Sequence, residues 1–451
     1  MIRLTVLALA ALLLMAGAIP ASADTAADVP VAAAPSTSAA GPGAEFDAEA
    51  ATEAYLATMS AEATARSNHY FEGGYWLILW DLVATLVVAW LLLRLRVSVR
   101  MRDWAERTTR FRWLQTALYS GQYFLVSTLL LLPWAAYEGY FREHQYGMSN
   151  QDLGAWLGDE AKGLAIAVVF GSAVLVAVYA VIRKAPRSWW LWGAGVALFF
   201  IAVGSVIAPL YLEPVFNKFY PIADTPLKAQ ILSLARANDI PVTQVYEFDA
   251  SKQTTKMSAH VSGMLGSAQI SMNDNLMNRA SPEEIKAALG HEMGHYVLNH
   301  EYKGLLFAGA IFLIGFALVA WAFERIAARN AARWGVRGVA DVAGLPLLFA
   351  LFSVYLFALT PVQNTLIRTM EIEADAFGLN AARQPDGFAQ AALHLSEYRK
   401  MRPGPVEEFV FFDHPSGWNR IHRAMVWKAE NLGTADIEAY DAAHHPPGTA
   451  P

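Results

Sequence analysis

The sequence predicts a mainly α-helical, polytopic membrane protein with six to seven spans and a smaller part outside the bilayer. The chain of 451 residues is 55% hydrophobic and 16% charged, with a mean hydropathy of +0.28, which is too apolar for an ordinary soluble enzyme. Six apolar segments approach the roughly 20 residues that a spanning helix needs. A more polar block with strand-like and helical patterns lies between the fourth and fifth of them.

The N-terminus reads as a secretory signal peptide over residues 1–23. An apolar run follows Arg3 and ends in Ala21-Ser22-Ala23, which has the form of a cleavage site. An uncleaved first membrane helix is the alternative, and it would supply a seventh span. Residues 24–45 are rich in Ala, Pro, Ser and Gly, which predicts a disordered leader.

Four spans are predicted in an N-terminal membrane region, 46–210, and two more in 304–360. They cover residues 75–95, 114–134, 163–182, 189–210, 304–323 and 342–360. Almost no charged residue lies within them, which disfavours a transporter. The net charge of −6 and the absence of cysteine predict no nucleic-acid partner and exclude disulfides and cysteine-ligated zinc.

The loops predict the orientation. Those after the first, third and fifth spans are rich in Arg and Lys, whereas the loop 137–162 carries mainly acids. The positive-inside rule places the basic loops in the cytoplasm. The block 211–303 and the segment 361–434 then face the other side, which predicts a bacterial inner-membrane protein whose active site is periplasmic. The last residues, 435–451, are predicted to be a disordered tail.

The block 211–303 has a mixed pattern that ends in a well-marked helix. We expect a helix from Thr225 to about Asn238, a strand over 240–248, a hairpin formed by 257–264 and 267–272, and a helix over 281–299. Ser281-Pro282 with Glu284 forms a capping box at the start of this last helix.

That helix carries the motif His291-Glu292-Met293-Gly294-His295. The spacing places two imidazoles one turn apart on the same face, where they can hold one zinc ion per chain. Glu292 is then positioned as the general base that takes a proton from water. Together these groups predict a metalloendopeptidase acting on a peptide or protein substrate at the lipid bilayer.

The third metal ligand is expected on the helix that contains Glu371 and Asp375. The two acids lie four residues apart on one face, so one can bind the metal while the other orients a ligand histidine. Arg368, one turn earlier, is expected to orient a carboxylate, and Glu373 to be solvated. His414 is a candidate oxyanion stabiliser with Arg420 in support. His300, five residues past His295, is expected to be a surface group.

The sequence disfavours two other classes of protein. An intramembrane protease would carry the motif within a spanning helix, but here a polar, capped helix start precedes it and Asn299-His300-Glu301 follows it. A non-catalytic membrane scaffold of the same fold would be expected to lack Glu292 or a ligand, and none is missing.

The chain resembles the zinc-dependent type I CAAX prenyl endopeptidases, a membrane branch of the gluzincins. The similarity runs from about residue 70 to 430, and the matching segments are 289–296, 371–377, His414-Pro415 with Arg420, 132–134, 146–149, 207–209 and 216–219. One departure is Ser258-Ala259, where the family usually has Asn-Ala.

The resemblance implies a helical barrel with a gluzincin-like zinc protease domain. It implies His291, His295 and Glu371 as zinc ligands, Glu292 as the base and Asp375 beside the site. It also implies that the strand 257–264 binds the substrate in an extended form. A quality-control protease of membrane proteins, with the same chemistry but without prenyl specificity, remains the alternative.

Overall fold

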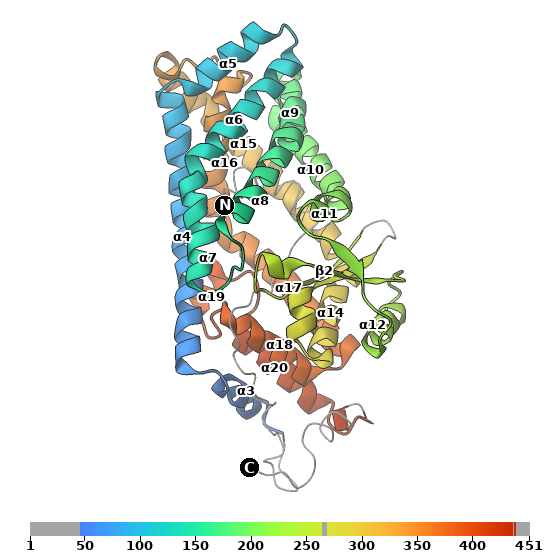
Figure 1. Ribbon diagram of the computed structural model, residues 1–451. Helices are drawn as coiled ribbons and strands as arrows, with labels where there is room; N and C mark the ends of the chain where they lie inside the picture. Colours follow the sequence, from blue (N-terminus) through green and yellow to red (C-terminus); the bar gives the residue numbers. More distant parts are fainter. Residues whose placement is uncertain (1–45, 264–267, 436, 439–451) are drawn as a thin grey trace.

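The computed structural model describes residues 46–263, 268–435 and 437–438 (Figure 1). The predicted signal peptide and leader lie outside the described residues, as do residues 439–451 of the predicted tail and the tip of the predicted hairpin, 264–267. The tail was predicted to begin at residue 435, but residues 437–438 are helical and Ile437 is buried in a hydrophobic core. The fold is mainly helical with one small sheet, as the sequence predicts.

Five long helical segments have the length and hydropathy of membrane spans. Three of them are extended through a turn of π-helix. The segments are α4 (Ala61–Arg94), α6 with α7 (Arg112–Ala136 and Arg142–Gln145), α8 with α9 (Leu153–Ile166 and Ser172–Lys184), α10 with α11 (Trp189–Ile207 and Glu213–Phe216), and α15 (His300–Trp334).

The sixth predicted span is a bent pair of helices. It consists of α16 (Leu345–Ala358) and α17 (Thr360–Ala382), whose directions differ by 58°. Pro361 lies in the first turn of α17, where its missing N–H and its ring prevent α16 from continuing. The bend directs α17 away from the spans and towards the metal-binding motif.

The spans close into a barrel. Helix α4 packs on α6, α6 on α9, α9 on α10, α10 on α15, α15 on α16, and α16 returns to α4. Their inner faces share one hydrophobic core that includes Tyr123, Phe124 and Phe323. Large apolar side chains, such as those of Trp90, Phe199 and Trp321, remain exposed on the outer surface, as expected for helices that face lipid.

A four-stranded sheet lies below the barrel in Figure 1. Its order is β1 (Phe219–Pro221), β2 (Val245–Phe248), β4 (Gln269–Asn273) and β3 (Ala259–Ser262). The predicted hairpin is confirmed, because β3 and β4 pair antiparallel. The sequence did not indicate β1 or the parallel pairing of β2 with β4. Strand β3 forms one edge of the sheet and packs on the motif helix.

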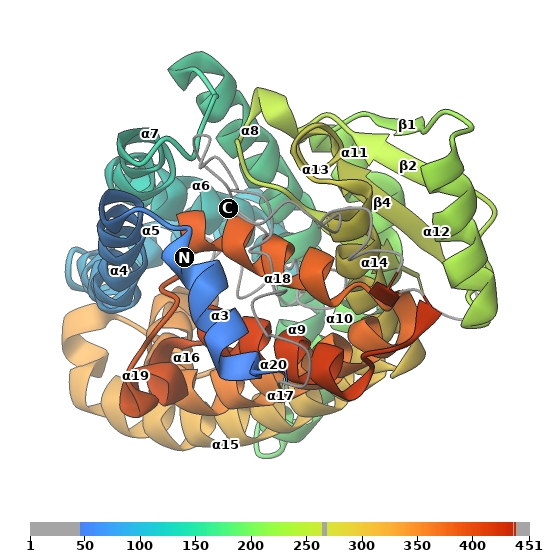
Figure 2. The same cartoon turned by 90° about the horizontal axis from the view of Figure 1, so that it is seen from below.

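Short helices complete this half of the molecule. They are α3 (Ala48–Ala57), α12 (Pro226–Ala237), α13 (Asp274–Arg279), α14 (Pro282–Val297), α18 (Pro385–His394), α19 (Pro405–Phe411) and α20 (Gly417–Glu430), while α5 (Val97–Thr108) lies at the opposite end of the molecule. Figure 2 shows α3 crossing α20, which it contacts. A second hydrophobic core joins α3, α18 and α20 beneath the motif helix.

Candidate metal centre and active site

The motif helix α14 begins as the sequence predicts. The Ser281 side chain accepts a hydrogen bond from the Glu284 N–H at 3.2 Å, and the Glu284 carboxylate accepts one from the Ser281 N–H at 2.6 Å. Pro282 occupies the first turn. This reciprocal cap fixes where the helix starts, and therefore which face carries the two ligand histidines.

Three glycines allow α14 and α17 to approach closely. A Cβ atom on Gly378 would lie 2.7 Å from the backbone nitrogen of His291, and one on Gly290 would lie 2.9 Å from the Cβ of Ala382. A Cβ on Gly294 would lie 3.1 Å from the Cα of Ala374. Because the backbones of these two helices are in contact, the side chain of Glu371 on α17 can reach the histidines of α14.

The predicted ligands come together in a compact group. The Nε2 atoms of His291 and His295 are 3.1 Å apart. The Glu371 oxygens lie 3.2 Å from Nε2 of His291 and 3.4 Å from Nε2 of His295. Tetrahedral coordination with bonds of about 2.0–2.1 Å requires ligand atoms about 3.3 Å apart. The three residues therefore fit a small tetrahedral metal ion.

The environment of the Glu371 carboxylate also favours a bound cation. Its side chain is completely buried, and the groups that face its oxygens are imidazole nitrogens 3.2–3.4 Å away, none of which makes a well-formed hydrogen bond to it. A buried carboxylate is costly unless a positive charge balances it, and a bound metal ion would supply that charge. Nε2 of His414 lies 3.2 Å from the same carboxylate, so this residue, 43 positions later in the chain, joins the group.

Asp375 supports His291 from the side away from Glu371. Its Oδ1 atom lies 2.8 Å from Nδ1 of His291, and its two oxygens accept hydrogen bonds from Arg420 at 2.6 and 3.1 Å. Asp375 is completely buried and Arg420 nearly so. The guanidinium of Arg420 is thus engaged by Asp375, and its position suits holding that carboxylate in place.

His300 is not a surface group, and that expectation was wrong. Its exposed fraction is 1%, and its Nδ1 atom lies 2.9 Å from Nδ1 of His295. Its Nε2 atom lies 3.0 Å from the carboxylate of Glu373, which also pairs with Lys303. Glu373 is exposed, as expected, with 43% of its side chain accessible, but it also takes part in this chain of contacts.

Arg368 does not orient a carboxylate, contrary to expectation. Its guanidinium donates to the backbone carbonyls of Glu408 and Phe412 and to the hydroxyl of Thr365. It therefore ties α17 to the segment that leads to His414. The sequence shows that Arg368 lies one turn before Glu371. It does not show that backbone carbonyls about 40 residues later accept the hydrogen bonds of this arginine.

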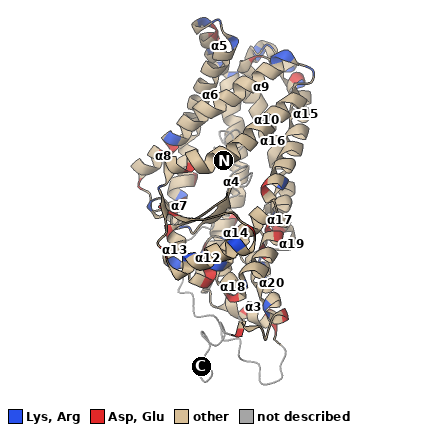
Figure 3. Ribbon diagram, turned by 90° about the vertical axis from the view of Figure 1, so that its right-hand side faces the viewer, with Lys and Arg blue, Asp and Glu red and all other residues tan. Residues whose placement is uncertain are grey.

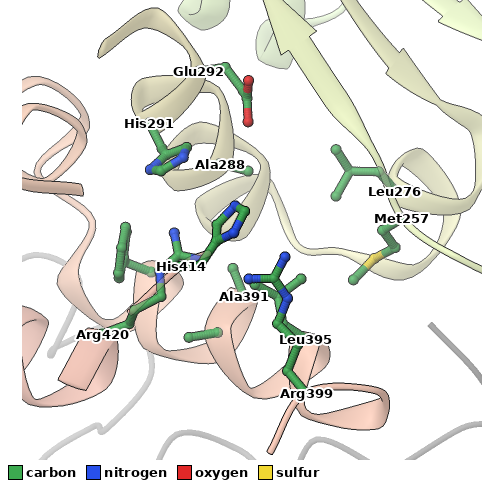
Figure 4. A pocket seen from close by; sticks show the side chains of 12 residues that line it. Met257, Leu276, Ala288, His291, Glu292, Ala391, Leu395, Arg399, His414 and Arg420 are labelled. Carbon is green, nitrogen blue, oxygen red and sulfur yellow. The ribbon is translucent and has the colours of Figure 1, made fainter. Parts of the chain in front are cut away.

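The motif helix and the C-terminal helices enclose a cavity with a largely apolar lining (Figure 4). Glu292 and His414 line it with Met257, Leu276 and Arg399. Arg399 was not among the residues singled out in the sequence. Burial raises the pKa of Glu292 to about 7. Burial lowers the pKa of His295 to about 3. Burial would also lower the pKa of His291, but the carboxylates of Asp375 and Glu371 raise it to about 10.

The comparisons with known proteins agree with this arrangement. Residues 47–218 match the CAAX prenyl protease N-terminal region with five membrane helices, and residues 221–428 match peptidase family M48. The uncharacterized metalloprotease YhfN of Bacillus subtilis is 31% identical over 337 residues, which cover 74% of this chain and 78% of that protein. The chain belongs to the type I CAAX prenyl endopeptidase family.

Other members of the family are more distant but of similar extent. CAAX prenyl protease 1 of Saccharomyces cerevisiae is 27% identical over 323 residues, covering 68% of this chain and 71% of the yeast protein. The crystal structure of S. mikatae Ste24p shares the fold with a TM-score of 0.68 at 22% identity, covering 81% of this chain and 89% of that one. The protein is therefore a membrane-embedded metalloprotease, of a family of zinc metalloendopeptidases.

Proposed function

We propose that this metalloprotease hydrolyses peptide bonds with one zinc ion held by His291, His295 and Glu371. The observation that carries the proposal is the convergence of ligand atoms on one point: the Nε2 atoms of His291 and His295 lie 3.1 Å apart, and each lies within 3.4 Å of an oxygen of the buried Glu371 carboxylate. Nitrogen and carboxylate ligands without cysteine are those of catalytic zinc sites in proteases.

The other side chains of the site would act as the general base, as the donor to the oxyanion and as positioning groups. A zinc ion in this position would polarise the scissile carbonyl and lower the pKa of water. Glu292, beside the ligands on the cavity wall, would take the proton from the attacking water and pass it to the leaving amine. His414 would donate to the developing oxyanion. Asp375 would hold His291, and Arg420 would hold Asp375.

An extended polypeptide is the substrate that suits the site. Strand β3 is an edge strand beside α14, and such an edge can bind a peptide through backbone hydrogen bonds. The apolar cavity next to it would accept apolar side chains. By the positive-inside rule this site would lie on the periplasmic side of a bacterial inner membrane, where the substrates would be membrane-associated polypeptides, with or without a prenyl group.

The test is Glu292→Gln, measured as metal content and cleavage of an unstructured peptide in detergent. We expect one zinc per chain in both proteins and at least a roughly 100-fold loss of cleavage in the variant, because the base is removed while the ligands remain. Glu283→Gln, the same change near the start of α14, is the control and should cleave normally. Normal cleavage by Glu292→Gln would contradict the proposal.

A further inference from the structure

The two candidate ligand histidines are supported by different partners. Nδ1 of His291 faces the buried carboxylate of Asp375 at 2.8 Å. Nδ1 of His295 faces another imidazole, Nδ1 of His300, at 2.9 Å. Beyond His300 the contacts continue to the Glu373 carboxylate at 3.0 Å and from there to the ammonium of Lys303 at 2.5 Å.

A break in the chain creates the contact between the two imidazoles. In an unbroken helix, a residue five positions after His295 would lie about 140° around the axis from it. Helix α14 ends at Val297, however, and Asn299 adopts a left-handed conformation with φ of 57° before α15 begins at His300. Asn tolerates this conformation better than most residues. The reversal brings the His300 ring back beneath His295 and buries it.

The hydrogen atoms can be assigned by following the chain of contacts. If Nε2 of His295 gives its lone pair to a metal, the proton of this neutral ring is on Nδ1, which must donate. His300 then accepts at Nδ1 and carries its own proton on Nε2. That proton is donated to Glu373, whose charge Lys303 balances. With both rings neutral, this assignment lets every contact be a hydrogen bond.

We propose that His300 is a positioning residue that fixes the tautomer and ring orientation of His295, with Glu373 as the final acceptor. The inference rests on the proposed ligand set. Metal-binding histidines almost always donate their second N–H to a carboxylate, a carbonyl or water. Here one imidazole is inserted between the ligand and its carboxylate, so an exposed glutamate on α17 can orient a buried ligand on α14.

The experiment measures the zinc dissociation constant of the full-length protein in detergent, by competition with a chelator of known affinity. His300→Phe fills the space without an acceptor, and His300→Asn keeps an oxygen close to the position of Nδ1. We expect His300→Phe to weaken zinc binding roughly 10- to 100-fold. His300→Asn should recover most of that loss, and Glu373→Gln should produce a smaller weakening.

Two controls separate positioning from general damage. His144→Phe changes an exposed histidine whose Nδ1 contacts only the backbone carbonyl of Tyr140, and should bind zinc as the wild type does. Thermal midpoints of the metal-free proteins show whether His300→Phe simply unfolds more easily. Wild-type affinity in His300→Phe, or equal losses in the Phe and Asn variants, would overturn the inference. Absence of zinc binding by the wild type would instead refute the proposed function.

Discussion

At the scale of single residues, the site depends on buried polar groups that contact several neighbours each. Asp375 contacts both His291 and Arg420, and Glu371 faces both histidines of the motif. Because a buried charge without a partner is costly, the removal of one group affects several others. Free energies of such substitutions should therefore not be additive.

Glu284 provides a prediction about pH. One oxygen caps α14 and the other lies 3.0 Å from His394. Burial alone would raise its pKa, but the contacts with His394 and Ser281 lower the pKa below its ordinary value of 4.5. A carboxyl group whose pKa is lower in the folded state stabilises the fold above its unfolded pKa, and this contribution is lost as the pH falls through the folded value.

We therefore expect Glu284→Gln to reduce the free energy of unfolding by about 1 kcal/mol at pH 7, because glutamine keeps the capping acceptor but loses the negative charge that the helix N-terminus stabilises. The difference from the wild type should shrink as the pH falls below 4.5, the ordinary pKa of the group. Thermal midpoints measured between pH 3 and pH 7 test this. A difference that stays constant across that range would contradict the assignment.

At the scale of elements, hydropathy and capping predicted most helices, because both are local properties. The five long spans, the bent pair of α16 and α17, the capped start of α14 and the hairpin of β3 and β4 were all indicated by patterns within each segment. Strand β1 has only three residues and pairs with a strand more than twenty positions later. A segment this short has no periodicity that a sequence pattern can show.

The candidate site likewise contains residues that local sequence patterns predicted and residues that they could not. His291, Glu292 and His295 follow from helical spacing, and Glu371 and Asp375 from a second helical pattern. His300 could not be placed, because its position depends on the left-handed Asn299. Asn299 itself was the available signal, since Asn just after a helix often marks such an end. Arg368 was misassigned because its acceptors are carbonyls about 40 residues away.

Arg368 leads to a prediction at this scale. Its guanidinium connects α17, which carries Glu371, to the segment that carries His414. Arg368→Met should free that segment and displace His414, so kcat should fall roughly ten- to a hundredfold, as small misplacements of catalytic groups do. Zinc content should not change, because no ligand is touched.

The measurement is peptide cleavage together with metal analysis. Arg402→Met is the matched control, since Arg402 pairs with Glu53 near the surface, and it should retain wild-type kcat. Loss of zinc from Arg368→Met would show that the arginine supports the ligands rather than the His414 segment.

At the scale of the whole molecule, the distribution of Lys and Arg agrees with the order of the spans along the chain. Figure 3 shows Lys and Arg gathered at the end of the molecule where α5 lies, opposite the end that carries α18 and α20. Arg102 reaches Asp341 at 2.6 Å there, so the basic loops after α4 and α15 are in contact. At the other end α3 packs on α20. The first and last described helices therefore lie at the same end of the molecule, as they would if the bent pair of α16 and α17 forms a sixth span.

The orientation across the membrane is the last prediction. Basic loops stay on the cytoplasmic side, so a fusion that ends after Arg187, between α9 and α10, should activate a reporter that functions only in the cytoplasm. A fusion after the last residue, Pro451, should activate only a reporter that functions outside it. Both reporters are placed at both positions, so each fusion controls the other. A cytoplasmic signal after Pro451 would mean that the metal centre faces the cytoplasm, and that the substrates are to be sought there.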